Sequence, residues 1–127
     1  MGKPLLYVRL GRGSRPVMYN AAHHSLEWIT TPVIMKFVEN FAKAKVTTGF
    51  LQGYDIDWLF RNTSLYIVPM VNPDGVDLVL GQIPTTSPYY INAQNINTTG
   101  LPLGQVWNAN IRGVDLNLNY PARMGNG

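Results

Sequence analysis

Residues 65–75 read LYIVPMVNPDG, in which an apolar stretch of one strand's length is followed at once by a turn-forming tetrapeptide. Residues 65–71 are almost wholly apolar, which is typical of a strand buried on both faces. Asn72 and Asp74 lie in the NPDG segment, which predicts a turn or a helix start where both side chains bond their own backbone. This stretch therefore predicts a strand inside a sheet and the point at which the chain leaves it.

Two further strands are predicted upstream. Residues 5–10 and 17–22 are rich in strand-forming residues, and a Gly-Ser-Pro cluster at 11–16 lies between them. Because that connection is short, the two strands are expected to pair as an antiparallel hairpin. His23 and His24 then lie just past the carboxyl end of the second strand.

Two helices are predicted between the hairpin and the buried strand. Apolar residues recur with a helical period in 33–44, Thr31 can serve as the N-cap, and Pro32 takes the first helical position. We expect this helix to end near Lys45, whose charge suits a helix carboxyl terminus. A shorter helix is expected at 55–61.

The last third of the chain has no strong periodic pattern. Residues 81–107 are rich in Gly, Pro, Asn and Thr and are predicted to form a long loop, whereas apolar and polar residues alternate in 111–122. Together the elements predict an α/β fold with a mixed, partly parallel sheet flanked by helices. Ligands bind such sheets at the carboxyl ends of strands. Three polar clusters are expected there: His23, His24 and Glu27; Asn72 and Asp74; Asp115 and Asn117.

The composition excludes several classes of protein. With 127 residues, of which 46% are hydrophobic, the chain suits one domain or a piece of one. Its ten basic residues give a net charge of +3 but form no dense run, so nucleic-acid binding is not predicted. The absence of cysteine excludes disulfides, thiolate metal sites and a cysteine nucleophile. No apolar run reaches the roughly 18 residues of a membrane span, and the first residues lack the apolar region of a secretory signal.

His24 and Glu27 form a candidate metal site. Their His-x-x-Glu spacing puts an imidazole and a carboxylate on one side of a helical turn or a strand-to-helix corner, from which both can reach one cation at about 2.0–2.2 Å. A second interpretation stays open, because a histidine near a strand end is commonly only hydrogen-bonded and Glu27 suits the start of a helix. His23 is adjacent in sequence and is expected to point elsewhere.

Three segments occur in an order and at a spacing that identify a family: MYNAAHHSLEWITTPVIMKFVE (18–39), VPMVNPDGVDLV (68–79) and NIRGVDLNLNYPA (110–122). Together they resemble the zinc carboxypeptidase family, and most of all its bacterial γ-D-glutamyl-diaminopimelate endopeptidases, which trim peptidoglycan peptides. The resemblance extends from about residue 5 to residue 122. It implies an α/β/α domain, a zinc cofactor, a peptide substrate and amide hydrolysis.

The resemblance also assigns roles to particular residues. His24 and Glu27 match the family's first two zinc ligands, and Asp115 matches the acid that orients the metal-bound histidine. Asn117 matches a substrate-binding asparagine, and Arg112 lies near the place of an oxyanion-stabilising arginine, although the spacing around it is shortened. In the family, zinc polarises the scissile carbonyl and activates a water, and a separate glutamate takes that water's proton.

Two parts of this machinery are missing from the sequence. No histidine follows His24 to provide the third zinc ligand, and no glutamate follows Glu39 to act as general base. Leu118 replaces the arginine with which carboxypeptidases hold a C-terminal carboxylate, which favours the endopeptidase branch, and Leu26 replaces a frequent arginine in the zinc motif. We therefore expect residues 1–127 to be the N-terminal half of the catalytic domain, with an incomplete site for one zinc ion and no peptidase activity alone.

Two other interpretations stay open. The chain can be a catalytically inactive, carboxypeptidase-like binding or regulatory module, or a truncated product with only a structural role. A half-domain with few charges and an exposed sheet edge is expected to associate with itself or with the remainder of the catalytic domain. A cell-wall peptide as substrate implies a location outside the cell or at the bacterial cell wall.

Other candidate sites have simpler explanations. Asp55 and Asp57 can form a paired-acid site but also suit the solvated start of a helix. Tyr89 and Tyr90 can touch a substrate or pack on the body of the domain. Ser25 lacks the base and acid partners of a serine triad.

Overall fold

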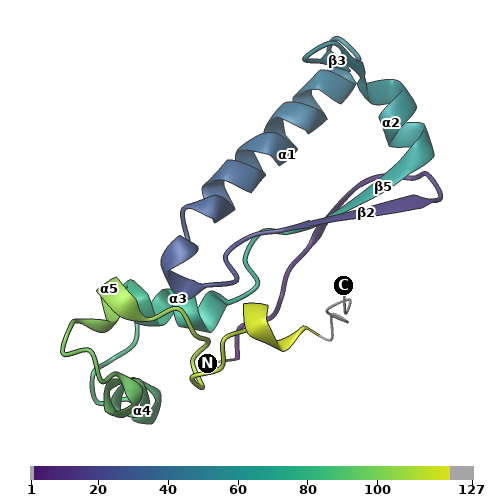
Figure 1. The fold of residues 1–127 in the computed structure, drawn as a ribbon. Coiled ribbons are helices and arrows are strands. Elements are labelled where there is room, and N and C mark those ends of the chain that lie inside the picture. Colours follow the sequence, from purple (N-terminus) through teal and green to yellow (C-terminus); the bar gives the residue numbers. More distant parts are fainter. Residues whose placement is uncertain (1, 121–127) are drawn as a thin grey trace, which may run out of the picture.

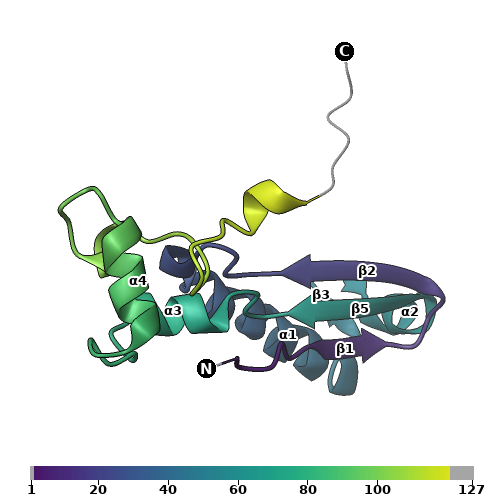
Figure 2. The same ribbon diagram turned by 90° about the horizontal axis from the view of Figure 1, so that it is seen from below.

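The computed structural model describes residues 2–120, in which helices flank a mixed sheet of three strands. The elements in chain order are β1 (Val8–Gly11), β2 (Arg15–Asn20), the 3₁₀ turn η1 (Ser25–Glu27), α1 (Thr30–Val46), β3 (Phe50–Leu51), β4 (Tyr54–Asp55), α2 (Ile56–Asn62), β5 (Thr63–Val68), α3 (Pro73–Val79), α4 (Pro88–Ile96), α5 (Leu103–Val106) and the 3₁₀ turn η2 (Asn117–Asn119). Helices α1 and α2 lie on one face of the sheet, and α3, α4 and α5 lie beyond the carboxyl ends of β2 and β5 (Figure 1, Figure 2). The predicted partly parallel sheet flanked by helices is confirmed.

Strand β5 is the centre of the sheet, whose strand order is β1-β5-β2. It pairs antiparallel with β1, where Val8 is opposite Ile67, and parallel with β2, where Val17 is opposite Leu65. The side chains of β5 that face the helices belong to a buried cluster of Phe41, Ala44, Ile56, Leu65 and Ile67. The opposite face of β5 carries Tyr66 and is only partly buried. The strand is therefore present as predicted, but helices cover only one of its faces in the described part of the chain.

The predicted hairpin of β1 and β2 is wrong, because β5 lies between the two strands. The connection from β1 to β2 passes over the start of β5, where the Gly13 N–H donates to the Thr63 carbonyl over 3.0 Å. A Cβ atom at Gly11 would lie closer than 3.0 Å to that carbonyl oxygen, and one at Gly13 would come equally close to the backbone of Asn62. The two glycines thus allow backbones to approach so closely that the short connection wraps around the end of a third strand.

Helix α1 is present as predicted, but its start differs from the expected Thr31 cap. The helix begins at Thr30, and the Thr31 hydroxyl donates to the Pro69 carbonyl over 2.6 Å. The Thr30 hydroxyl accepts from the Ala22 N–H over 2.9 Å and donates to the Glu27 carbonyl over 2.7 Å. Both threonines therefore attach the helix start to the chain that leaves the sheet. Between residues 2 and 120, no helix combines the length and apolar character needed to cross a membrane.

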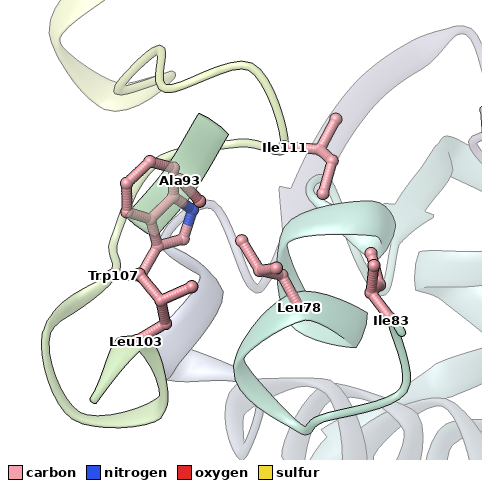
Figure 3. Packing of buried hydrophobic residues seen from close by; sticks show 6 residues of the cluster. All are labelled: Leu78, Ile83, Ala93, Leu103, Trp107 and Ile111. Atoms are coloured by element: carbon pink, nitrogen blue, oxygen red, sulfur yellow. The ribbon is translucent and has the colours of Figure 1, made fainter. Parts of the chain in front are cut away.

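Residues 81–107 contain α4 and α5, so the prediction of a long loop is wrong. These helices pack around Trp107, which is 5% exposed, in a second buried cluster (Figure 3). Its members come from α3 onward: Leu78, Ile83, Ala93, Leu103, Trp107 and Ile111. They escape prediction because they are spread through Gly- and Pro-rich sequence with no helical period.

The alternating segment 111–122 does not form a strand in its described part. Residues 121 and 122 lie outside the described residues, and the preceding ones form a turn and η2. The alternation predicted that Asp115 and Asn117 lie at the end of a strand. In the structure they follow a turn instead. Alternation alone was a weak signal here, since within residues 2–120 this segment pairs with no strand of the sheet.

We predict that Ile67→Ala lowers the free energy of unfolding by about 2–5 kcal/mol, because Ile67 is fully buried in the centre of the sheet. The matched control is Ile29→Ala, which makes the same chemical change at a side chain that is 57% exposed and is expected to cost about 0.5 kcal/mol or less. Equilibrium urea unfolding measures both. Equal losses for the two variants would contradict the central place of β5.

Candidate metal centre

The chain turns sharply between β2 and α1, and His24 lies in this turn. Ala22 has a φ of +52° and is 2% exposed. This left-handed conformation costs a residue with a Cβ about 1–2 kcal/mol, and two tertiary contacts hold it: its N–H donates to the Thr30 hydroxyl, and its carbonyl accepts from the Asn72 N–H over 3.0 Å. The turn η1 follows, and the Glu27 N–H donates to the His24 carbonyl over 3.1 Å.

His24 lies between two carboxylates that face opposite nitrogens of its ring. The distance from His24 Nδ1 to Glu27 Oε1 is 3.1 Å, and the distance from His24 Nε2 to Asp115 Oδ1 is 3.5 Å. The side chain of His24 is 22% exposed, that of Asp115 34% and that of Glu27 56%. The turn therefore brings together all three residues to which the sequence assigned the metal site, with Glu27 on the side open to solvent.

Asp115 is held in place by the backbone that follows it. Its Oδ1 atom accepts from the Asn117 N–H over 2.9 Å and from the Leu118 N–H over 3.4 Å, and its carbonyl accepts from the Asn119 side chain over 2.6 Å. The same oxygen faces His24 Nε2. This arrangement suits a carboxylate that accepts a hydrogen bond from the Nε2–H. The ring then keeps its proton on Nε2 and its lone pair on Nδ1.

The spacing of His24 and Glu27 fits the first half of a zinc site. Two ligand atoms that lie about 2.1 Å from a tetrahedral zinc ion are about 3.4 Å apart, close to the 3.1 Å between Nδ1 and Oε1. Asp115 faces the other ring nitrogen and cannot bind the same ion through this geometry. Accordingly, within residues 2–120 no group of three or more His, Cys, Asp or Glu side chains is placed to hold a metal ion.

The carboxylates raise the pKa of His24 above its ordinary value of 6.5. The main cause is the hydrogen bond to Glu27, and the negative charges of Glu27 and Asp115 add to it, while partial burial opposes it. A metal ion at Nδ1 has to compete with a proton on this ring, so the site favours metal binding at higher pH.

His23 lies apart from this group, as expected. Its Nε2 atom is 2.7 Å from the Tyr120 hydroxyl, and the two rings are tilted with centroids 5.7 Å apart.

Arg112 and Asn117 are less closely tied to the pair. Arg112 lines an open hollow of about 540 Å³ together with Asn72 and Tyr120, and no hydrogen bond of residues 2–120 joins its side chain to His24. Asn117 is two residues from Asp115, and its contribution there is the backbone N–H. Their roles in oxyanion stabilisation and substrate binding stay predictions.

Two buried polar side chains lie beneath the turn and were given no site role by the sequence. Ser25 is fully buried, and its hydroxyl lies within hydrogen-bond distance of the Trp107 and Ala109 carbonyls. Asn72 accepts from the Gly75 N–H over 3.1 Å, as expected for the start of α3, but its amide also donates to distant carbonyls. The sequence drew attention to Asn72 only as part of a turn and to Ser25 only as an improbable nucleophile, because their partners at residues 107–109 are far away in the sequence.

The other polar candidates take structural roles. Asp55 caps α2 by accepting from the Trp58 N–H over 2.8 Å, and Asp57 pairs with Lys45 over 2.6 Å, which lowers the pKa of Asp57. Asp74 was expected to bond the backbone of its own turn. Instead its carboxylate accepts from the Gly2 N–H over 2.8 Å.

Comparison with known proteins identifies the family. The model of a family described as zinc carboxypeptidase matches residues 1–127. The chain is 36% identical over 130 residues to gamma-D-glutamyl-L-diamino acid endopeptidase 1 of Lysinibacillus sphaericus, which covers 97% of this chain and 31% of that protein. It is 36% identical over 124 residues to the uncharacterised protein YqgT of Bacillus subtilis strain 168, covering 96% of this chain and 33% of that protein.

A more distant relative comes from an animal. Carboxypeptidase E of Caenorhabditis elegans is 29% identical over 98 residues, covering 77% of this chain and 17% of that protein. The chain thus spans about a third of the length of the two bacterial relatives and less of this one. These matches confirm the resemblance that the three sequence motifs indicated.

We predict that Glu27→Gln lowers the pKa of His24, because it removes the largest cause of the upward shift. Because the folded-state pKa is raised, the interaction stabilises the fold fully below the unfolded-state value near 6.5 and is lost as the pH rises through the folded-state pKa. The stability difference between the wild type and Glu27→Gln should therefore shrink as the pH rises. NMR titration of the His24 ring and urea unfolding at several pH values measure the two effects.

Glu39→Gln provides the control, since it neutralises an exposed carboxylate on α1 that pairs with Lys36 and Lys43. It should leave the titration of His24 unchanged. An unchanged His24 pKa in Glu27→Gln would show that the two side chains do not meet as described.

Proposed function

This chain belongs to the zinc carboxypeptidase family, and from that premise we propose that it supplies two ligands, His24 and Glu27, to the zinc centre of an amide-hydrolysing metallopeptidase. The observation that carries the proposal is the convergence of His24 Nδ1 and Glu27 Oε1 at 3.1 Å, with Asp115 at the opposite ring nitrogen. A hydrogen-bonded histidine at a strand end needs only one partner, whereas this ring faces a carboxylate on each side.

Each residue has a defined part in the proposal. Zinc, when bound, polarises a scissile carbonyl and lowers the pKa of a bound water to about 7. His24 offers the Nδ1 lone pair, and Glu27 offers a carboxylate oxygen. Asp115 accepts a hydrogen bond from the Nε2–H and so fixes the tautomer in which Nε2 carries the proton. Asn117 is proposed to bind substrate, and the Arg112 guanidinium is proposed to stabilise an oxyanion.

Peptidoglycan-type peptides are the proposed substrates. A relative that is 36% identical over nearly the whole chain is named as an endopeptidase of γ-D-glutamyl-L-diamino acid bonds. Leu118 is 79% exposed and carries no charge, so it cannot hold a C-terminal carboxylate as an arginine does. With such a substrate, the proposed location of the enzyme is outside the cell or at the bacterial cell wall.

The 127-residue chain is proposed to be the N-terminal half of the catalytic domain and to be inactive alone. Its sequence has no histidine after His24 and no glutamate after Glu39, so neither a third ligand of that type nor the family's general base is present. With two protein ligands, zinc keeps about half of its tetrahedron for water, and binding is expected to be weak.

A second candidate function, as a binding module, is favoured by one apolar surface. This surface, here called the β2–α1 strip, consists of Val17, Tyr19, Val33, Phe37 and Leu51, which line three adjoining hollows. Val33 is 66% exposed and Tyr19 49%, and β2 is an edge strand of the sheet. Apolar side chains beside free strand N–H and C=O groups favour pairing with another strand. We propose a second copy of this chain, or the remainder of the catalytic domain, as the partner.

Zinc titration tests the main proposal. The wild type is expected to bind zinc weakly, with chemical-shift changes at the ring of His24, and His24→Ala and Glu27→Ala are each expected to weaken binding at least about tenfold. His23→Ala is the matched control, because it removes the neighbouring imidazole, which lies against Tyr120 instead.

Two outcomes would contradict this proposal. Zinc binding that neither His24→Ala nor Glu27→Ala affects would show that the ligands are assigned wrongly. Hydrolysis of a γ-D-glutamyl-diaminopimelate peptide by the purified chain would show that the missing histidine and glutamate are not needed.

Sedimentation velocity over a range of concentrations tests the association. Tyr19→Lys is expected to reduce self-association, because lysine on an edge strand opposes strand pairing. Tyr89→Lys makes the same change on α4, at a side chain that is 40% exposed and outside the strip, and should have no effect. A wild-type chain that stays monomeric throughout would exclude the second copy as the partner.

A further inference from the structure

Two buried polar side chains lie beneath the His24–Glu27 turn without forming part of the candidate metal site. Ser25 is fully buried and Asn72 is 3% exposed. Buried polar groups are nearly always hydrogen-bonded, so the partners of these two side chains show what they hold together.

Asn72 uses its amide to join three segments. Nδ2 donates to the His23 carbonyl and to the Ala109 carbonyl, both over 3.1 Å, and Oδ1 accepts from the Gly75 N–H over 3.1 Å. Gly75 is required for this position, because a Cβ atom there would lie closer than 3.0 Å to the Asn72 amide. The side chain is therefore fitted into a close space, with both of its N–H donors in use.

Ser25 binds the same distant segment from the other side of His24. Its N–H donates to the Asn108 carbonyl over 3.3 Å, and its hydroxyl proton is shared between the Trp107 carbonyl and the Ala109 carbonyl, the latter at 3.2 Å. The Ala109 carbonyl thus accepts from both buried side chains. The residues on both sides of His24 are therefore held in place. His23 is held through its carbonyl, and Ser25 through its N–H and its hydroxyl.

The segment that these residues hold leads directly to Asp115. Asn110 closes a tight loop after Ala109: its side-chain oxygen accepts from the Arg112 N–H over 2.8 Å and from the Val114 N–H over 3.1 Å, and its N–H donates to the Val114 carbonyl over 2.8 Å. A fixed Ala109 and a closed loop leave little freedom for the position of Asp115.

We propose that Asn72 and Ser25 are positioning residues of the metal centre, which fix where Asp115 lies relative to the ring of His24. The inference rests on the proposed zinc site. Both side chains act through the backbone of residues 107–109 and touch neither the ligand atoms nor the carboxylate of Asp115. Loss of their donors lets the two halves of the centre move apart, so that Asp115 no longer selects the tautomer that leaves Nδ1 free.

The variant Asn72→Asp separates this role from the capping of α3. An aspartate keeps an oxygen that accepts from the Gly75 N–H and is as good an N-cap as asparagine. When ionised it has no donor, so it loses both bonds to the His23 and Ala109 carbonyls. Ser25→Ala removes the other donor with a smaller change of charge and volume. Asn40→Asp, on the exposed surface of α1, is the control for the added negative charge.

The experiment is an NMR-monitored zinc titration of the full chain at pH 8, with each variant also made in an Asp115→Ala background. We expect Asn72→Asp and Ser25→Ala each to raise the zinc dissociation constant about tenfold, as for other changes behind a metal ligand. Asn40→Asp should leave it within about twofold. In the Asp115→Ala background the two variants should have little further effect, because the residue through which they act is gone.

The possible outcomes distinguish this inference from the function on which it rests. If wild-type His24 binds zinc and both variants bind it equally well, the inference is overturned and the proposed zinc site stands. An equal loss with and without Asp115 overturns it too, because the effect would then be one of general stability. A wild type whose His24 does not respond to zinc overturns the proposed site and this inference with it.

Discussion

The rest of the structure depends on the position of β5 between β1 and β2. Since the strand order is β1-β5-β2, every pairing in this sheet involves β5. Because β2 runs parallel to β5, the two carboxyl ends meet at one edge, and the Ala21 N–H donates to the Val68 carbonyl over 3.1 Å. The chain therefore leaves both strands side by side, which brings the His23–His24 turn next to Asn72. A hairpin of β1 and β2 would not have created this edge.

At this end of the sheet, hydrogen bonds of buried polar groups help to join the two halves of the molecule. One buried cluster lies between the sheet and α1, the other surrounds Trp107, and they share no residue. The turn η1 contacts both α3 and α5, and the buried polar atoms of Ser25 and Asn72 lie in this contact. Hydrogen bonds are directional, so they set the position of a ligand more sharply than apolar contacts do. The loss of one buried donor leaves the carbonyls that it served without that partner, which costs about 1–3 kcal/mol.

The sequence predicted the elements better than it predicted their arrangement. A continuous apolar run and a Pro-initiated helical period are local signals, and β5 and α1 appear close to where these signals put them. Strand order is not local: it depended on Gly11 and Gly13, whose closeness to β5 no periodicity reveals. For the candidate site, the His-x-x-Glu spacing predicted that the two side chains share one side of a turn, and they lie 3.1 Å apart, while their role as zinc ligands stays a prediction. The amide bonds of Asn72 to residues 23 and 109 could not be predicted, because they require the tertiary structure itself.

The exposed side of the candidate metal centre lies near one end of the free edge of β2, because β2 ends just before the His24 turn. Glu27 is 56% exposed, so a zinc ion bound beside it could still take a ligand from the solvent side. The β2–α1 strip runs along the free edge of the strand that ends just before the His24 turn. A further strand that paired in parallel with β2 would have its carboxyl end at the end of the sheet where His24 lies. The carboxyl end of β5 already lies there. Residues that follow such a strand would emerge next to the open side of the ligand pair, which supports the proposal that the remainder of the catalytic domain is the partner of this chain.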